Sequence, residues 1–220
     1  DGNHTYYADN YLVHNSCEGG GGGHCFVAGT KVAAVTESGV SQINIEELKE
    51  GDRVLTYNIE KQETEPANII VATSREKDEI VEFVFANGTR TKHTPDHPYY
   101  VIGKGWCSSN PNITKCRYEK ENPELSNVKT IEIGDSVILM DKSTTKLEEI
   151  NSIDADTVTT YNINVDANSN YFADGVLVHN KGGGPGGGGG VMLIHCWDGS
   201  VIDPSKGESC PPIIDDGEGG

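Results

Sequence analysis

The chain has 220 residues, of which 35% are apolar and 23% charged, a composition typical of a soluble globular protein with one folded domain. Its net charge of −17 and pI near 4.7 disfavour nucleic acid as a partner, because a phosphate backbone would be repelled. No stretch approaches the roughly 18 apolar residues of a membrane-spanning helix, so we expect no membrane partner.

Two glycine-rich segments divide the chain. Residues 17–24 and 181–190 are predicted to be flexible linkers. Residues 25–180 between them form the expected folded unit, which is long enough to bury a core. Residues 191–220 are too few for a core of their own, and we expect them to start a flanking host segment. Because the chain does not begin with Met, we expect it to be a piece of a longer protein.

Short apolar segments separated by turn residues predict an all-β domain of many short strands. Three predicted hairpins pair 31–35 with 40–44, 80–86 with 89–94 around Asn87-Gly88, and 171–173 with 176–178 around Asp174-Gly175. Alternation over residues 81–85 predicts a half-buried strand. The polar segment 108–127, which carries two prolines, is predicted to be an exposed loop.

The sequence contains two internal repeats. Residues 45–58 align with 128–141, and each copy has a short apolar turn, a Gly-Asp corner and a strand, which predicts pseudo-symmetry. Residues 1–15 match 166–180 at nine of 15 positions, including the closing Leu-Val-His-Asn. We therefore expect residues 1–16 to be a remnant of the C-terminal end of an upstream copy of the domain.

Cys25 opens the expected domain directly after a linker. Its thiol can attack the carbonyl of His24 and convert the amide into a thioester, an uphill exchange that requires the fold to distort the peptide. A thiol with a pKa of about 8.5 is only a few per cent ionised at pH 7, so a nearby base would help. The alternative is an unreactive cysteine at the start of a strand.

A polar segment at the end of a predicted hairpin strand supplies candidate partners, namely His93, Thr94, Asp96 and His97. An imidazole can protonate the departing amine near neutral pH. The Thr94 hydroxyl, three residues before His97, can hydrogen-bond the same peptide and hold it distorted. The alternative is a polar strand end with hydrogen-bonded histidines.

The expected domain ends in His179-Asn180, followed by Lys181. The carboxamide nitrogen of Asn180 can attack its own backbone carbonyl and form a succinimide, which releases Lys181 as a free amine. His179 is placed to polarise that carbonyl or to protonate the leaving nitrogen.

Together these elements resemble the Hint domain, the fold shared by inteins and the hedgehog autoprocessing module, and most closely its bacterial intein-like class. The resemblance covers residues 25–180. CFVAGTKV and EELKEGDRVLTYN resemble the N-terminal block, TPDHPYYV resembles the central Thr-x-x-His block, and YNINVDANSNYFADGVLVHN resembles the C-terminal blocks.

The resemblance implies an all-β horseshoe with pseudo-twofold symmetry that brings both ends of the domain into one cleft. It implies single-turnover cleavage of the domain's own backbone at His24-Cys25 and at Asn180-Lys181, with no cofactor and with flanking host segments as partners in cis. The implied catalytic residues are Cys25, Thr94, His97, His179 and Asn180, and the supporting ones are Asn162, Asp96 and His93.

Three positions depart from the intein pattern. Lys181 is no nucleophile, so ordinary transesterification is blocked and cleavage is favoured over splicing. Hydrolysis of the thioester, attack by an external thiol or amine, and separate cleavage after Asn180 remain. Asn162 stands where many inteins have an Asp, and Ser169 stands where the family often has a His.

Two alternatives stay open at this point. One is a weakly active or inert Hint-fold domain with a structural or binding role, and the other is a metal site formed by Cys25, His93 and His97. The six cysteines include no CxxC pair, which argues against a zinc ribbon. The spacings of Cys107/Cys116 and Cys196/Cys210 are compatible with loop disulfides or with free thiols, so the cellular compartment is undetermined.

Overall fold

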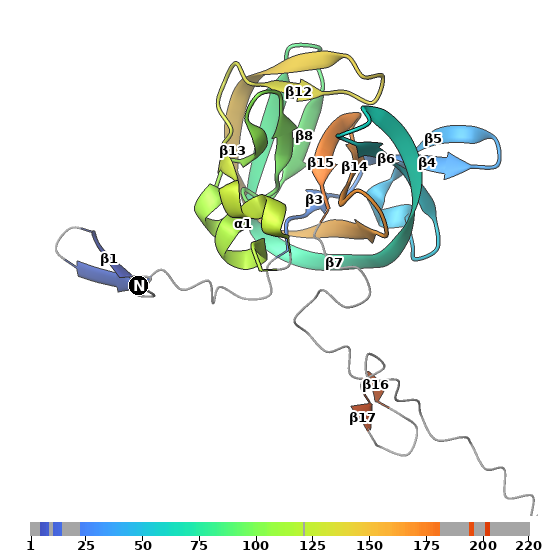
Figure 1. Ribbon diagram of the computed structural model, residues 1–220. Coiled ribbons are helices and arrows are strands. Elements are labelled where there is room, and N and C mark those ends of the chain that lie inside the picture. The colour runs from blue at the N-terminus through green and yellow to red at the C-terminus, as the bar shows by residue number, and fades with distance from the viewer. Residues whose placement is uncertain are drawn as a thin grey trace, which may run out of the picture.

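The computed structural model describes residues 5–8, 11–14, 23–120, 122–180, 194–195 and 201–202 (Figure 1). Residues 23–180 form an all-β body, as predicted. Its strands are β3 (Phe26–Val27), β4 (Lys31–Thr36), β5 (Gly39–Asn44), β6 (Arg53–Asn58), β7 (Glu63–Phe85), β8 (Arg90–His93), β9 (Tyr99–Val101), β10 (Gly105–Ser108), β11 (Lys129–Thr130), β12 (Ser136–Ile138), β13 (Thr144–Val165), β14 (Asn170–Ala173) and β15 (Val176–His179). Its helical elements are η1 (Ile45–Glu47), α1 (Pro111–Tyr118) and η2 (Pro123–Asn127).

These strands join in one sheet with the order β11-β10-β9-β12-β13-β3-β8-β7-β6-β4-β14-β15, and β5 pairs with β4. An additional pairing sets Val178 of β15 opposite Tyr99 of β9, so the last strand of the body returns beside the segment that follows β8. Not every strand is short: β7 has 23 residues and β13 has 22, and the two pair antiparallel along most of their length. Figure 1 shows β7 curving around the outside of the body.

The three predicted hairpins are confirmed as β4–β5, β7–β8 and β14–β15. In the β14–β15 turn, Asp174 and Gly175 have φ of 48° and 80°. Positive φ at both central residues defines the type I′ turn that suits the twist of antiparallel strands, and Asp-Gly adopts it at little cost. Local turn chemistry therefore sets the register that carries β15 toward its last residue, His179.

The first internal repeat has a matching backbone in its two copies. In one copy, Gly51 N donates to Ile69 O over 2.9 Å and Ile69 N donates to Asp52 O over 2.7 Å. In the other, Gly134 N donates to Leu147 O over 2.7 Å and Leu147 N donates to Asp135 O over 2.9 Å. The two Gly-Asp corners thus attach to β7 and β13 in the same way, which supports the pseudo-twofold relation between the two halves.

The second repeat also has a backbone counterpart. Strands β1 (Thr5–Ala8) and β2 (Tyr11–His14) pair with Thr5 opposite His14, and β14 pairs with β15 with Asn170 opposite His179. The two registers coincide under the sequence alignment of the repeat. The remainder of 1–16, most of 17–24, and 181–220 except β16 (Ile194–His195) and β17 (Val201–Ile202) lie outside the described residues.

The core consists of two clusters. The larger lies among the strands that carry Phe26, Phe83 and Tyr99, all fully buried. The smaller contains Trp106 with Tyr118 of α1 and Leu125 of η2. Burying one such large apolar side chain stabilises a fold by about 2 kcal/mol, so the smaller cluster fixes the helical segment against the sheet.

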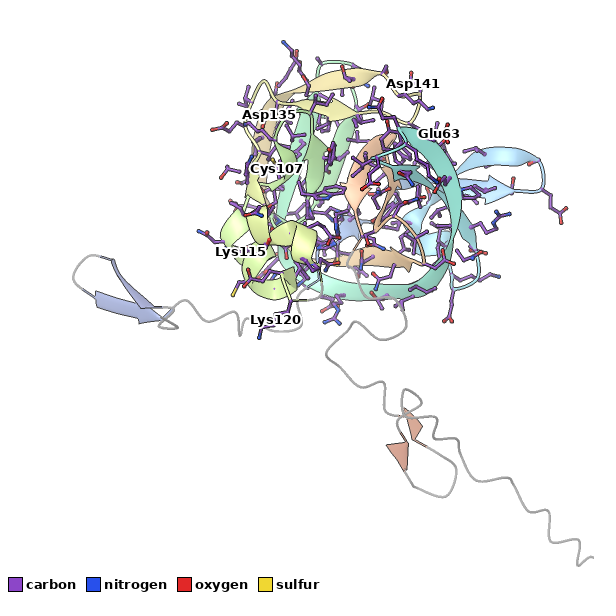
Figure 2. All side chains as sticks on the ribbon, viewed as in Figure 1. Glu63, Cys107, Lys115, Lys120, Asp135 and Asp141 are labelled. Atoms are coloured by element: carbon purple, nitrogen blue, oxygen red, sulfur yellow. The ribbon has the colours of Figure 1, made fainter. Side chains whose placement is uncertain are left out.

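The prediction that residues 108–127 form an exposed loop was wrong. Asn110 caps α1 by accepting from Ile113 N over 3.3 Å, and Pro111 occupies the first turn. Lys115 and Lys120, labelled in Figure 2, are exposed, but Tyr118 and Leu125 are 2% and 0% exposed. The segment is polar because one of its faces meets solvent, whereas a few apolar residues on the other face are buried.

The half-buried interpretation of residues 81–85 also needs correction. Val84 is 7% exposed and therefore buried, so only Glu82 of this stretch reaches toward solvent.

Cys107 is a free buried thiol, so it forms no disulfide with Cys116, which is itself disulfide-bonded. No helix among the described residues is long and apolar enough to cross a membrane.

Candidate functional site

Cys25 lies buried at the entrance to β3, and Thr94 contacts it from two sides. The Cys25 amide N donates to Thr94 Oγ1 over 3.0 Å, and the Thr94 amide N donates to Cys25 O over 3.0 Å. The Cys25 thiol is 3.2 Å from the carbonyl oxygen of Gly23. The N–H of the His24-Cys25 peptide is therefore held by the threonine hydroxyl in a buried setting.

Burial raises the pKa of the Cys25 thiol, and a hydrogen bond with Thr160 only partly opposes this effect. The nearby negative charge of Asp96 raises this pKa further, whereas Lys77 acts in the opposite direction. The thiol is consequently protonated at neutral pH, and it needs a base before it can act as a nucleophile.

Three buried imidazoles surround the Cys25 segment. The ring of His97 lies with its centroid 4.7 Å from that of His24, 5.9 Å from that of His93, and 4.1 Å from that of Phe26. Burial, followed by the charges of the neighbouring histidines, holds the pKa of His97 well below its usual range. His97 is therefore a neutral imidazole, which can relay a proton but is a weaker base than an exposed histidine.

The protonation state of His93 is coupled to the stability of the fold. Burial lowers its pKa from 6.5 to about 4, although its Nδ1 lies 2.8 Å from Thr94 O. Because the folded state favours the neutral ring, the unfolded chain takes up the proton first as pH falls. We expect this group to remove roughly 3 kcal/mol from the free energy of unfolding between pH 6.5 and pH 4.

Urea denaturation of the wild type and of His93→Gln across this pH range tests that prediction. The wild type should lose more stability than His93→Gln on acidification. An equal loss in both proteins would contradict a buried neutral His93.

Asp96 ties the Thr94–His97 turn to helix α1. Its Oδ2 accepts from Arg117 Nη1 over 2.9 Å and from the Tyr118 hydroxyl over 3.1 Å. Burial alone would raise the pKa of this carboxyl, but His24, Thr94 and Arg117 hold it below its ordinary value. The charge of Asp96 is thus satisfied by a buried network that positions the turn.

His179 and Asn180 are 0% and 1% exposed at the end of β15. His179 Nδ1 contacts Asn180 O, and His179 Nε2 is 3.0 Å from Oε1 of Glu124. The Asn180 carboxamide nitrogen donates to Val165 O over 3.4 Å, and its backbone N donates to Ser169 O over 2.9 Å.

The two ends of the body meet at His24. Its ring centroid is 4.7 Å from that of His97 and 6.1 Å from that of His179. The backbone N of His179 also donates to Pro98 O over 3.0 Å, immediately after His97. Cys25, Thr94, His97, His179 and Asn180 are therefore brought into one buried region, whereas Lys181 lies outside the described residues.

Asn162 and Ser169 occupy different places in this region. Asn162 is 3% exposed, and its Nδ2 donates to Asn164 Oδ1 over 3.3 Å, while its own Oδ1 has no hydrogen-bond partner in the described part of the chain. The β3–β13 register pairs Phe26 with Tyr161, so its continuation sets Asn162 opposite Cys25. Ser169 contributes its backbone carbonyl, which a histidine could equally supply.

Sequence reasoning missed Glu124, Tyr118, Trp106 and Thr160 as members of the site. Trp106 lies edge-on to His179 with ring centroids 4.7 Å apart, and the ring centroids of Tyr118 and His24 are 4.6 Å apart. The Asn-Pro pair at 110–111 was the available signal for a helix here. No comparable sequence signal links Glu124 or Thr160 to the site.

A polar cavity of about 350 Å³ opens beside Thr94 and Asp96, and is also lined by residues 76–79 and by Arg117. Within the described residues, no group of three His, Cys, Asp or Glu side chains is arranged to hold a metal ion. The alternative metal site of Cys25, His93 and His97 therefore gains no support.

Comparison with known proteins identifies the family. Residues 34–180 match the model of the intein splicing domain. The solution structure of a bacterial intein-like domain from Clostridium thermocellum has 28% identity and a TM-score of 0.56, and the match covers 71% of this chain and 98% of that one. Comparison with curated proteins gives no match.

Two further solved structures show the fold alone. The DnaB intein from Synechocystis sp. PCC 6803 has 13% identity and a TM-score of 0.56, and the match covers 72% of this chain and 99% of that one. The Ssp DnaB mini-intein variant M86 has 12% identity and a TM-score of 0.57, and the match covers 74% of this chain and 96% of that one.

The body is thus a Hint-fold, protein-splicing or autoprocessing domain that acts within a host protein in cis. The family match begins in β4 and extends to Asn180, so it spans more than half of the chain and includes the turn with Thr94 and His97. The chain belongs to the intein splicing domain family.

Proposed function

We propose that this domain cleaves its own backbone at His24-Cys25 through a thioester and at Asn180-Lys181 through a succinimide. Each bond is cut once per molecule and without a cofactor. Residues 25–180 are then the released domain, while 1–16 and 191–220, with the linkers 17–24 and 181–190, belong to the flanking material.

The first cleavage begins when Cys25 Sγ attacks the carbonyl carbon of His24. The new C–S bond replaces the C–N bond, and the thiol proton ends on the freed amine of Cys25. The hydrogen bond between Thr94 Oγ1 and the Cys25 amide favours a distorted peptide, and neutral His97 is suited to carry the proton. Water or an external thiol or amine then resolves the thioester.

The second cleavage is an attack by the Asn180 carboxamide nitrogen on the backbone carbonyl carbon of the same residue. A C–N bond closes the five-membered ring, the bond to Lys181 breaks, and one carboxamide proton passes to the leaving nitrogen. Burial of Asn180 favours this reaction because it restricts the side chain and excludes competing water.

Cleavage is favoured over splicing because Lys181 has no hydroxyl or thiol to receive the acyl group. The cavity beside Thr94, the residue that hydrogen-bonds the Cys25 amide, is the entry we propose for an external thiol or amine. The acidic side chains within 76–79 would attract an amine more than a thiolate.

One observation carries this proposal. The ring centroid of His24, at the first scissile bond, lies 4.7 Å from the ring centroid of His97 and 6.1 Å from that of His179. A purely structural Hint-fold domain is the competing function, and the raised pKa of the Cys25 thiol favours it.

Intact-mass measurements on the purified chain over time, with and without dithiothreitol, separate the two functions. The proposed function predicts thiol-dependent release of residues 1–24 and thiol-independent release of the segment after residue 180. A chain that stays whole under both conditions would establish the structural alternative.

The Thr94 hydroxyl offers a finer test. Thr94→Val leaves the buried Cys25 N–H without its acceptor, and we expect it to slow thiol-induced cleavage about tenfold to a hundredfold. Thr94→Ser keeps the acceptor and should restore most of the rate. Equal slowing by both substitutions would show that packing, rather than the hydrogen bond, matters at this position.

A further inference from the structure

His179 contacts a hydrogen-bond acceptor at each of its ring nitrogens. Nδ1 faces the carbonyl oxygen of Asn180, and Nε2 faces a carboxylate oxygen of Glu124 at 3.0 Å. A neutral imidazole has one N–H, so it would leave one lone pair pointing at an acceptor. Only the imidazolium, with two N–H groups, donates to both partners.

The carboxylate is held by an anchored segment. Glu124 belongs to η2, in which the neighbouring Leu125 is 0% exposed, and Asn122, which precedes η2, is 2% exposed. Hydrogen bonding with His179 is also the main reason that the pKa of Glu124 lies below its ordinary value. Glu124 is itself partly exposed, so solvent weakens its field without removing the directed contact.

We propose that Glu124 is a positioning residue that holds His179 as an imidazolium with Nδ1–H directed at the scissile carbonyl of Asn180. This inference rests on the proposed function for its kinetic consequence. In the succinimide step, negative charge develops on that carbonyl oxygen, and a donor already in place stabilises it. Glu124 acts through His179 and touches no reacting atom.

The other ionisable groups around His179 do not replace this carboxylate. His24 and His97 are imidazoles, which would oppose a positive charge rather than stabilise it. Tyr118 contacts His24, and the charge of Asp96 is engaged by Arg117 and Tyr118. Among the described contacts of the His179 ring, Glu124 is the acidic one.

The kinetic test compares Glu124→Gln with Glu119→Gln, which makes the same change on a residue that pairs with Lys115 over 3.9 Å. We expect Glu124→Gln to slow C-terminal cleavage about tenfold at pH 7, the size of effect expected for one charge-assisted hydrogen bond. The pH profile of the C-terminal cleavage rate should also differ between the two variants, because Glu124→Gln removes the carboxylate that faces His179 Nε2. Glu119→Gln should match the wild type.

Nitrogen-15 NMR of the His179 ring in Asn180→Ala tests the protonation state without cleavage, since this variant keeps the backbone carbonyl. The ring should carry two protonated nitrogens at pH 7 with Glu124 present and be mainly neutral with Glu124→Gln. A neutral ring in both proteins, or parallel pH profiles for the two glutamine variants, would overturn the inference. If the wild type shows no C-terminal cleavage, the proposed function fails, while the NMR result still decides the role of Glu124.

Discussion

Asn180→Ala is expected to abolish release of the segment that follows residue 180 and to leave thiol-induced cleavage at Cys25 in place. The substitution removes the only nucleophile of the succinimide step, so the bond should survive as long as an ordinary peptide bond. A rate decrease of at least ~10³-fold is expected, because a covalent pathway is lost rather than weakened. Intact-mass measurements over days provide the readout.

Asn151→Ala is the matched control, since Asn151 is exposed on β13, away from both scissile bonds in the sequence, and its side chain donates to Glu149 over 3.2 Å. It should cleave at the wild-type rate at both bonds. Continued C-terminal release from Asn180→Ala would mean that another group or water cuts this bond.

Cys25→Ala should stop thiol-dependent cleavage at the His24-Cys25 bond completely, because without the sulfur no thioester can form. Release after residue 180 should continue in this variant, since Asn180 needs no acyl transfer to cyclise. Measuring both fragments in one time course after addition of dithiothreitol checks the two expectations together.

Cys107→Ala is the control for loss of a buried thiol. Cys107 is also free and 0% exposed, but it lies on β10 and hydrogen-bonds Gly105 O at 3.6 Å. It should keep both cleavages. Thiol-dependent cleavage that persists in Cys25→Ala and disappears in Cys107→Ala would contradict the assignment of the nucleophile.

Much of the fold follows from local chemistry. Asp174-Gly175 and Asn87-Gly88 specify hairpins because Asp174, Gly175 and Gly88 adopt positive φ at little cost. The repeated Gly-Asp corners specify two equivalent attachments to β7 and β13. The length of β7 was not predictable in this way. Its stretch 71–79 is mostly exposed and charged, and it is a strand because its backbone pairs with β13.

The residues of the site were only partly accessible from the sequence. Cys25, Thr94 and Asn180 stand out because their chemistry suits backbone cleavage at the ends of a domain. Glu124 does not stand out in the sequence, because its role depends on His179. The two residues are 55 positions apart, and the fold brings His179 Nε2 within 3.0 Å of the Glu124 carboxylate. The helical segment was missed for a related reason, since two buried side chains decide its packing in an otherwise polar stretch.

The mass of the released 25–180 fragment tests the central claim most directly. If the Asn180 carboxamide cuts the chain, the fresh fragment is lighter by one water than a chain that ends in Asn180 with a free carboxyl group. In water enriched in oxygen-18, it should carry no heavy oxygen until the succinimide hydrolyses. A fragment that appears from the start with the carboxyl mass and one heavy oxygen would contradict the account, because water would then be the nucleophile.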